Sequence, residues 1–125
     1  MAPAETASDP DLFAMSESGG GLYLFLLHRP PEPTPPGRGP QYQEWADSLR
    51  ARDQLVRAGG LQANEGWMLT GSATALNATR LSFPEGAVEG FFLVTARDST
   101  DVIEAARISP HFAYGGAIEV RRVTN

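Results

Sequence analysis

Two short stretches of the chain are apolar on both alternating faces. Residues 22–27 have the sequence LYLFLL, and residues 91–94 have the sequence FFLV. Successive side chains of a β-strand point to opposite faces of the sheet, so a strand with this pattern must be covered on both sides. We therefore expect a sheet whose central strands are these two segments, buried between two layers of structure.

Helical spacing follows each of these strands. After the first strand, residues recur at helical intervals at Tyr42, Trp45, Leu49, Arg52 and Val56. This spacing predicts a helix over residues 41–58, ended by Gly59-Gly60. After the second strand, Asp98 or Ser99 can cap a further helix, which must end near Ser109 because Pro110 follows.

The remaining segments predict turns and shorter strands. Residues 29–40 hold six of the ten prolines and predict an irregular connector that leads into the first helix. Runs around residues 67–69 and 74–76, separated by Thr70-Gly71-Ser72, predict a hairpin. Residues 83–86 (FPEG) predict a type I turn.

The last strand is expected from Ala117 to Val123, with Ile118 and Val120 on one face. The predicted order is strand, helix, strand, inserted hairpin, strand, helix, strand, which favours an α+β fold of the split βαβ type with an antiparallel sheet. Two helices cover only one face of such a sheet. We therefore expect the second apolar face to pack against the same face of another copy, in a homodimer.

Charge and composition limit the classes of partner. The chain has ten arginines, no lysine and no cysteine, and a net charge of −5. Four acidic residues and no basic ones lie in residues 1–18, so ten arginines face eleven carboxylates in residues 19–125. We expect residues 1–18 to be a disordered acidic arm and residues 19–125 to form one nearly neutral domain. Such a domain lacks the positive excess of a nucleic-acid surface.

The sequence predicts a cytoplasmic protein without a membrane segment. The longest strongly apolar stretch has the length of a strand, and the first 18 residues lack the features of a signal peptide. The absence of cysteine fits a reducing compartment. The two histidines are far apart in the chain, and the glycine run at 19–21 has no lysine, so we expect no metal site, no nucleotide site and no bound cofactor.

Several segments together resemble the YCII-related family, also called DGPF-domain proteins. They are residues 24–29 (LFLLHR), the helix that bears Trp45, residues 89–94 (EGFFLV) and residues 109–121 (SPHFAYGGAIEVR). The resemblance covers residues 22–123 and implies a ferredoxin-like βαββαβ fold assembled as a dimeric α/β barrel. Residues 83–86 (FPEG) stand where the family has its Asp-Gly-Pro-Phe motif.

Five residues are candidates for a functional site. His111 follows the second helix and matches the family's Pro-His segment, so we consider it as a catalytic acid or base, against the alternative that it only packs at a helix end. Glu119 and Arg121 share a strand face and could bind a ligand, or form an ordinary ion pair. His28 could line the same cavity, and Trp67 could form an apolar pocket wall, whereas Trp45 is expected in the core.

The function expected from these observations is the binding of a small anionic or carbonyl-bearing molecule between sheet and helices. The resemblance implies cofactor-free hydrolase, isomerase or lyase chemistry. A non-catalytic dimeric interaction module, or a cofactor-free monooxygenase of the wider dimeric α/β-barrel group, are the alternatives. Fold alone does not separate these classes.

Overall fold

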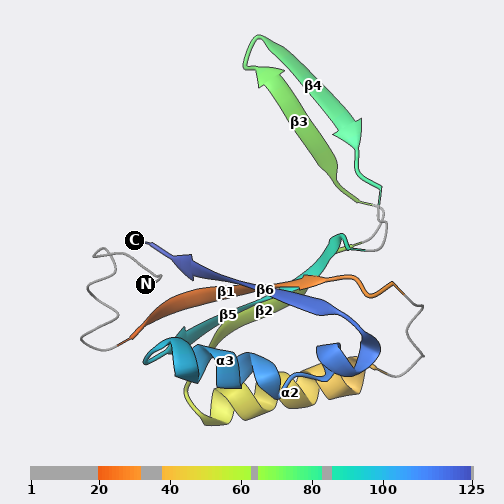
Figure 1. Ribbon diagram of the computed structural model, residues 1–125. Coiled ribbons are helices and arrows are strands. Elements are labelled where there is room, and N and C mark those ends of the chain that lie inside the picture. The colour runs from red at the N-terminus through yellow and green to blue at the C-terminus, as the bar shows by residue number, and fades with distance from the viewer. Residues whose placement is uncertain (1–19, 32–37, 63–64, 83–85, 125) are drawn as a thin grey trace.

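The computed structural model describes residues 20–31, 38–62, 65–82 and 86–124. The predicted acidic arm, most of the proline-rich connector and residues 83–85 of the predicted turn lie outside these residues. Within these residues the chain forms an α+β fold with two α-helices, a four-stranded antiparallel sheet and a separate two-stranded sheet (Figure 1). In chain order the elements are β1 (Gly21–His28), α2 (Gly39–Ala51), β2 (Leu55–Gly60), β3 (Trp67–Ser72), β4 (Ala75–Arg80), β5 (Val88–Ala96), α3 (Ser99–Arg107), the 3₁₀ helix η1 (Pro110–Tyr114) and β6 (Ala117–Val123).

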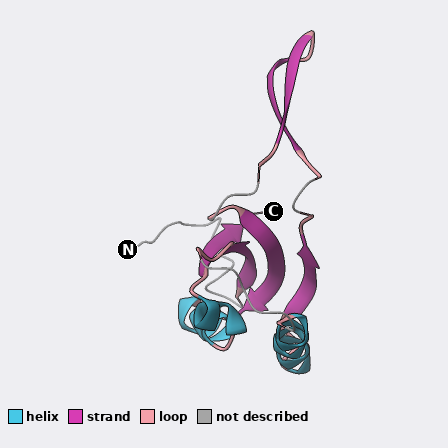
Figure 2. Ribbon diagram, turned by 90° about the vertical axis from the view of Figure 1, so that its right-hand side faces the viewer, coloured by secondary structure: helices cyan, strands magenta, loops and turns pink. Residues whose placement is uncertain are grey.

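The two strands that are apolar on both faces lie at the centre of the larger sheet, as predicted. The strand order is β2-β5-β1-β6, and all three pairings are antiparallel. Both helices that the structure describes lie on one face of this sheet, and neither of them covers its other face (Figures 1 and 2). We call these the helix face and the open face.

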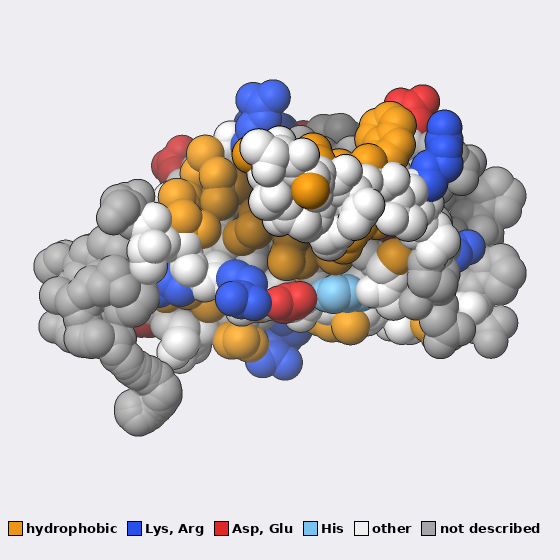
Figure 3. Space-filling model, turned by 90° about the horizontal axis from the view of Figure 1, so that it is seen from above, with side chains coloured by type: hydrophobic (Ala, Val, Ile, Leu, Met, Phe, Trp, Pro, Cys, Tyr) orange, Lys and Arg blue, Asp and Glu red, His pale blue; other side chains and the backbone are white. Residues whose placement is uncertain are grey.

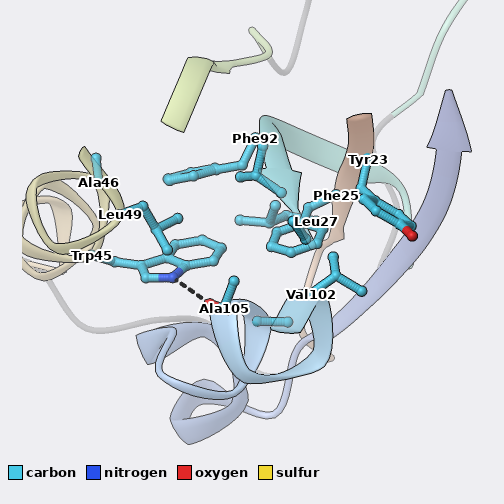
Figure 4. Close-up of a cluster of buried hydrophobic side chains, with 12 residues drawn as sticks. Tyr23, Phe25, Leu27, Trp45, Ala46, Leu49, Phe92, Val102 and Ala105 are labelled. Atoms are coloured by element: carbon cyan, nitrogen blue, oxygen red, sulfur yellow. Dashed lines mark hydrogen bonds between the residues drawn. The ribbon is translucent and has the colours of Figure 1, made fainter. Parts of the chain in front are cut away.

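The core lies between the helix face and the two helices. Tyr23, Phe25 and Leu27 alternate along β1 and point into it, together with Phe92 and Val94 of β5 (Figure 4). The core is closed on the helix side by Trp45 and Leu49 of α2 and by Val102, Ala105 and Ala106 of α3. The expectation that Trp45 is a core residue is confirmed. Its indole nitrogen donates a 3.0 Å hydrogen bond to the Ala105 carbonyl and thereby joins the two helices.

The predicted helix over residues 41–58 is wrong at its end. The helix stops at Ala51, and residues 55–60 form the edge strand β2 instead. Asp53 has a left-handed backbone (φ 59°), which an aspartate tolerates better than most residues and which turns the chain. The buried Gln54 then donates a 3.1 Å hydrogen bond to the Thr95 carbonyl, which ties the start of β2 to β5. Gly59-Gly60 therefore ends a strand.

The predicted hairpin is present, but its turn lies elsewhere. Ser72 pairs with Ala75, so residues 73 and 74 make the turn, and the predicted turn at residues 70–72 belongs to β3. Gly71 has φ 101°, and a Cβ there would collide with the Ala75 carbonyl oxygen. A glycine is therefore required at this position near the end of β3. The hairpin rises from the body on the side opposite the helices (Figures 1 and 2).

The second predicted helix and the last strand are confirmed. The Asp98 side chain caps α3 by accepting a 2.8 Å hydrogen bond from the Asp101 amide. The helix ends at Arg107, and Ser109-Pro110 then starts η1. Strand β6 spans Ala117–Val123 as predicted.

The open face is apolar but not buried. Residues of β1 and β5 that alternate with the core residues are half-buried, as is one residue of β6: Leu22, Leu24, Leu26, Phe91, Leu93 and Val123. Seen from above, hydrophobic side chains gather on this face beside the hairpin, next to a row of basic, acidic and histidine side chains (Figure 3). Nothing in the described part of the chain covers this face as the helices cover the other.

Candidate functional site

His111 is fully buried where η1 packs against α2 and the ends of β1 and β6. The local sequence fixes it. Ser109 accepts a 3.1 Å hydrogen bond from the His111 amide, and Pro110 begins the short helix. A Cβ at position 116 would collide with the imidazole ring, so Gly116 makes room for His111.

The hydrogen bonds of His111 define which nitrogen carries the proton. The Nε2 atom lies 2.8 Å from the His28 carbonyl oxygen, which can only accept, so Nε2 must be protonated. Burial lowers the pKa of His111, which favours the neutral ring and leaves a lone pair on Nδ1. The Tyr42 hydroxyl lies 2.6 Å from Nδ1 and donates a hydrogen bond to it. Tyr42 and His111 therefore form a directed, partly buried proton-donor and acceptor pair.

Arg38 and Glu89 lie beside this pair. Two guanidinium nitrogens of Arg38 donate to the two carboxylate oxygens of Glu89, at 3.1 and 3.0 Å. One of these nitrogens also lies 3.4 Å from the Tyr42 hydroxyl oxygen. Oxygen Oε2 of Glu89 is 3.9 Å from Nδ1 of His111. The four side chains form one cluster, which we call the Tyr42–His111 site, brought together from α2, β5, η1 and the residue that precedes α2.

The site borders a hollow of about 430 Å³. Arg38, Tyr42 and Glu89 form its polar side, while Leu27, Ala46, Ala58 and Phe92 are among its apolar walls. An apolar hollow with a few polar groups on one side is typical of sites for small organic molecules. Its volume falls within the usual range of about 300–1,000 Å³ for such sites.

The charges of the site are balanced without a ligand. The Glu89 carboxylate raises the pKa of Arg38, so the guanidinium stays charged and its pair with Glu89 is neutral overall. Burial raises the pKa of the Tyr42 hydroxyl, which keeps its proton near neutral pH. A site composed of a neutral ion pair, a neutral tyrosine and a neutral histidine suits an uncharged polar group better than a strongly charged one.

A second hollow of about 450 Å³ lies where α2 ends and α3 begins. Its walls are mainly polar, and they include Arg52, Gln54, Arg97 and Asp101. Asp101 accepts a 2.9 Å hydrogen bond from the Arg97 amide and two longer ones from the Arg97 side chain, which together lower the pKa of Asp101. Gln54 and Arg97 both donate to Asp101 at the start of α3, so the carboxylate of this hollow is already engaged by its neighbours.

The structure brings three of the five predicted site residues together, away from His111. His28 Nε2 lies 2.9 Å from Glu119 Oε1, and Arg121 donates to Glu119 Oε2 at 3.0 Å. Pairing with β1 puts Glu119 and Arg121 on the open face, opposite Leu26 and Leu24. His28 also lies 2.7 Å from the Gly86 carbonyl, and this bond together with Glu119 raises the pKa of His28. His28 meets His111 only through its backbone carbonyl.

Trp67 lies on the projecting hairpin and is 57 % exposed. Sequence reasoning missed Arg38 and Glu89 as site residues and placed Tyr42 only on the apolar stripe of a helix. The available signals were a glutamate inside a strand that is otherwise apolar and a tyrosine one turn before Trp45. Their partners lie 51 and 69 residues away, which no local pattern reveals.

Two further observations bear on the kind of site. Among the described residues, no three histidine, aspartate or glutamate side chains gather as a metal site would require. None of the helices that the structure describes is long and apolar enough to cross a membrane.

No protein-family model matches the chain, and no curated protein matches it significantly.

Proposed function

We propose that the Tyr42–His111 site binds a small carbonyl-bearing molecule and catalyses proton transfer on it without a cofactor. The observation that carries this proposal is the 2.6 Å contact between the Tyr42 hydroxyl and His111 Nδ1 beside the 430 Å³ hollow. A buried neutral histidine whose second nitrogen is fixed by a backbone carbonyl is a positioned base. Tyr42 is the member of this pair that lines the hollow.

The geometry suggests how a proton would move. A C–H or O–H group of the substrate gives its proton to the Tyr42 oxygen, while the Tyr42 proton passes to His111 Nδ1. The imidazolium formed is stabilised by Glu89, whose Oε2 already lies 3.9 Å away. Arg38 retains N–H groups beyond those bonded to Glu89 and Tyr42, and these can stabilise the negative charge that develops on the carbonyl oxygen. The proton then returns to a different atom of the substrate, which completes an isomerisation. If that atom belongs to a leaving group, its protonation allows the group to depart.

The family resemblance is part of the same proposal. The strand order β2-β5-β1-β6, with the β3–β4 hairpin set aside, agrees with a ferredoxin-like arrangement, and this supports a YCII-related protein. The half-buried leucines of the open face support a homodimer of the dimeric α/β-barrel type, because a monomer would leave this patch in water. The lack of cysteine favours a reducing compartment such as the cytoplasm.

Proton exchange on a panel of simple carbonyl compounds tests the proposed activity. The purified protein is incubated in D₂O with small ketones, aldehydes and 2-oxo esters, and deuterium uptake next to the carbonyl is followed by NMR. We expect at least one compound to exchange faster with the protein than without it. We expect Tyr42→Phe to lose this acceleration, by roughly 10²-fold or more for a missing acid–base group.

The control variant is Arg121→Gln, which removes a side chain of the open face and should leave exchange unchanged. A thermal-shift screen of the same panel measures binding separately, because a ligand of the native state raises the melting temperature. Exchange that is equal in wild type and Tyr42→Phe would overturn the proposed catalytic role. The absence of both binding and exchange would favour the alternative, a non-catalytic dimeric interaction module.

A further inference from the structure

The β3–β4 hairpin is amphipathic. Because directly paired residues of an antiparallel hairpin share a face, Trp67, Leu69, Leu76 and Ala78 lie on one side, together with Arg80. The other side carries Met68 near the base and then Thr70, Ser72, Asn77 and Thr79. We call the first side the Trp67 face. A strand pair with this pattern is typical of a sheet that is covered on one side.

Neither side of the hairpin is covered by the residues that the structure describes. Every residue of β3 and β4 is exposed, including Trp67 at 57 %, Leu69 at 56 % and Leu76 at 58 %. A two-stranded hairpin without a packing partner is at best marginally stable in water. The Trp67 face therefore needs an apolar surface that the described residues of its own chain do not provide.

The position of the hairpin indicates where that surface is. The hairpin rises from the body on the side of the open face (Figures 1 and 2). Its six-residue strands span about 20 Å at about 3.3 Å per residue, whereas packed sheets lie only about 10 Å apart. If two copies pack open face to open face, each hairpin extends past the sheet of the other copy.

The area of the interface leads to the same conclusion. A four-stranded face with seven-residue strands measures roughly 19 by 23 Å, so two such faces bury roughly 900 Å². Stable interfaces need about 1,200–2,000 Å². Two hairpins of roughly 10 by 20 Å, each covering an equal area of the other copy, add roughly 800 Å². With the hairpins the interface reaches the usual size, and without them it falls short.

We infer that the β3–β4 hairpin is a dimerisation arm whose Trp67 face packs on a second copy of this chain. The inference rests on the proposed open-face dimer and adds a second contact to it. Each subunit thus contacts the other through its hairpin. Residues 67–80 contribute nothing to the core of their own domain and pack on the surface of the partner instead.

Two neighbouring residues of β3 provide a matched test. Leu69 and Met68 are similarly exposed, at 56 % and 55 %, but lie on opposite sides of the hairpin. Sedimentation equilibrium over a range of concentrations measures the dimer dissociation constant of wild type, Leu69→Ser and Met68→Ser. We expect Leu69→Ser to raise this constant at least about tenfold, since each copy loses the burial of one leucine. Met68→Ser should change it less than about twofold, since its side chain stays in water in the dimer.

Tryptophan fluorescence is the second measurement. The chain has two tryptophans, and Trp45 is buried in the core. The difference in acrylamide quenching between the wild type and Trp67→Phe therefore reports on the exposure of Trp67. We expect Trp67 to be readily quenched in dilute monomer and protected in concentrated dimer.

The outcomes separate the arm from the dimer. A stable dimer in which Trp67 remains fully quenchable and Leu69→Ser has no effect would overturn the arm and leave the open-face dimer standing. An equal effect of Leu69→Ser and Met68→Ser would overturn the assignment of the Trp67 face. A wild-type chain that stays monomeric at all concentrations, or that dimerises only with a different protein, would overturn both proposals.

Discussion

Strands β1 and β5 are apolar on both faces of the central sheet, but the two faces have very different surroundings. On β1, Phe25 points to the helix face and is fully buried, while its neighbour Leu24 points to the open face and is only half-buried. Strand β1 is thus covered by the two helices on one side, whereas nothing in the described part of the chain buries its other side to the same degree. The sequence pattern predicts that both faces of the sheet are covered, and the helices that the structure describes cover one of them.

One histidine lies on the helix side of the sheet and one on the open face, and the pKa values of the two are shifted in opposite directions. His111, on the helix side, is buried between the Tyr42 hydroxyl and the His28 carbonyl, and burial lowers its pKa. On the open face, the His28 ring lies between the Gly86 carbonyl and the Glu119 carboxylate, and both bonds raise its pKa. A buried histidine with a lowered pKa suits proton transfer, whereas a histidine whose pKa is raised by a carboxylate partner suits a structural contact.

Truncation of neighbouring residues on β1 should show the largest difference between the faces. We expect Phe25→Ala to lower the free energy of unfolding by about 3–5 kcal/mol, because it opens a cavity in the core. In dilute solution Leu24→Ala should cost only about 1 kcal/mol, because its side chain is already half in water. Urea unfolding at low and high protein concentration measures both. Equal costs in dilute solution would mean that the open face is as well covered as the helix face within one chain.

Removing an arginine from each face should give a smaller but still clear contrast. Arg38→Gln leaves Glu89, whose side chain is 11 % exposed, without its paired hydrogen bonds, and should cost about 1–3 kcal/mol of stability. In dilute solution Arg121→Gln breaks a pair in which the arginine is 68 % exposed, so its effect on the stability of the single chain should lie within experimental error. Thermal unfolding compares the two variants. The contrast is broken if Arg121→Gln proves the more damaging change.

The pH dependence of the two histidines should be opposite in sign. Since folding raises the pKa of His28, its contribution to stability is complete below about pH 6.5 and disappears as the pH rises through the raised pKa. Folding lowers the pKa of His111, so its contribution is complete above about pH 6.5 and declines as the pH falls towards the lowered pKa. NMR titration of the two imidazole rings, assigned with His28→Gln, measures both shifts. Two midpoints on the same side of 6.5 would contradict this pairing.

Much of the fold could be predicted from local patterns with a direct physical cause. The central strands follow from apolar residues on both alternating faces, and the start of α3 follows from the Asp98 cap. The end of α2 could not be predicted, because Leu55 and Val56 continue the helical spacing by chance. What ends the helix is a left-handed aspartate and a long-range bond from Gln54 to Thr95, and neither is visible in the sequence pattern.

The candidate site was predicted only in part. His111 stood out because a histidine after Ser-Pro lies at a helix end, but its partner Tyr42 has the spacing of a core residue. The bonds that give Tyr42 and Glu89 their chemistry come from residues far away in the chain. His28, Glu119 and Arg121 do meet, as alternating strand residues can, but they do so on the open face, where the pairing of β1 with β6 puts them.

The protonation of His111 tests the central claim most directly, because the proposed proton transfer requires a neutral ring whose Nδ1 carries no proton. Nitrogen-15 NMR of the imidazole at neutral pH distinguishes the two ring nitrogens and their protons. We predict a protonated Nε2 and an unprotonated Nδ1 that accepts a hydrogen bond, with a change in the Nδ1 shift in Tyr42→Phe. A proton on Nδ1 at neutral pH, or an Nδ1 shift that is the same in Tyr42→Phe, would contradict the account.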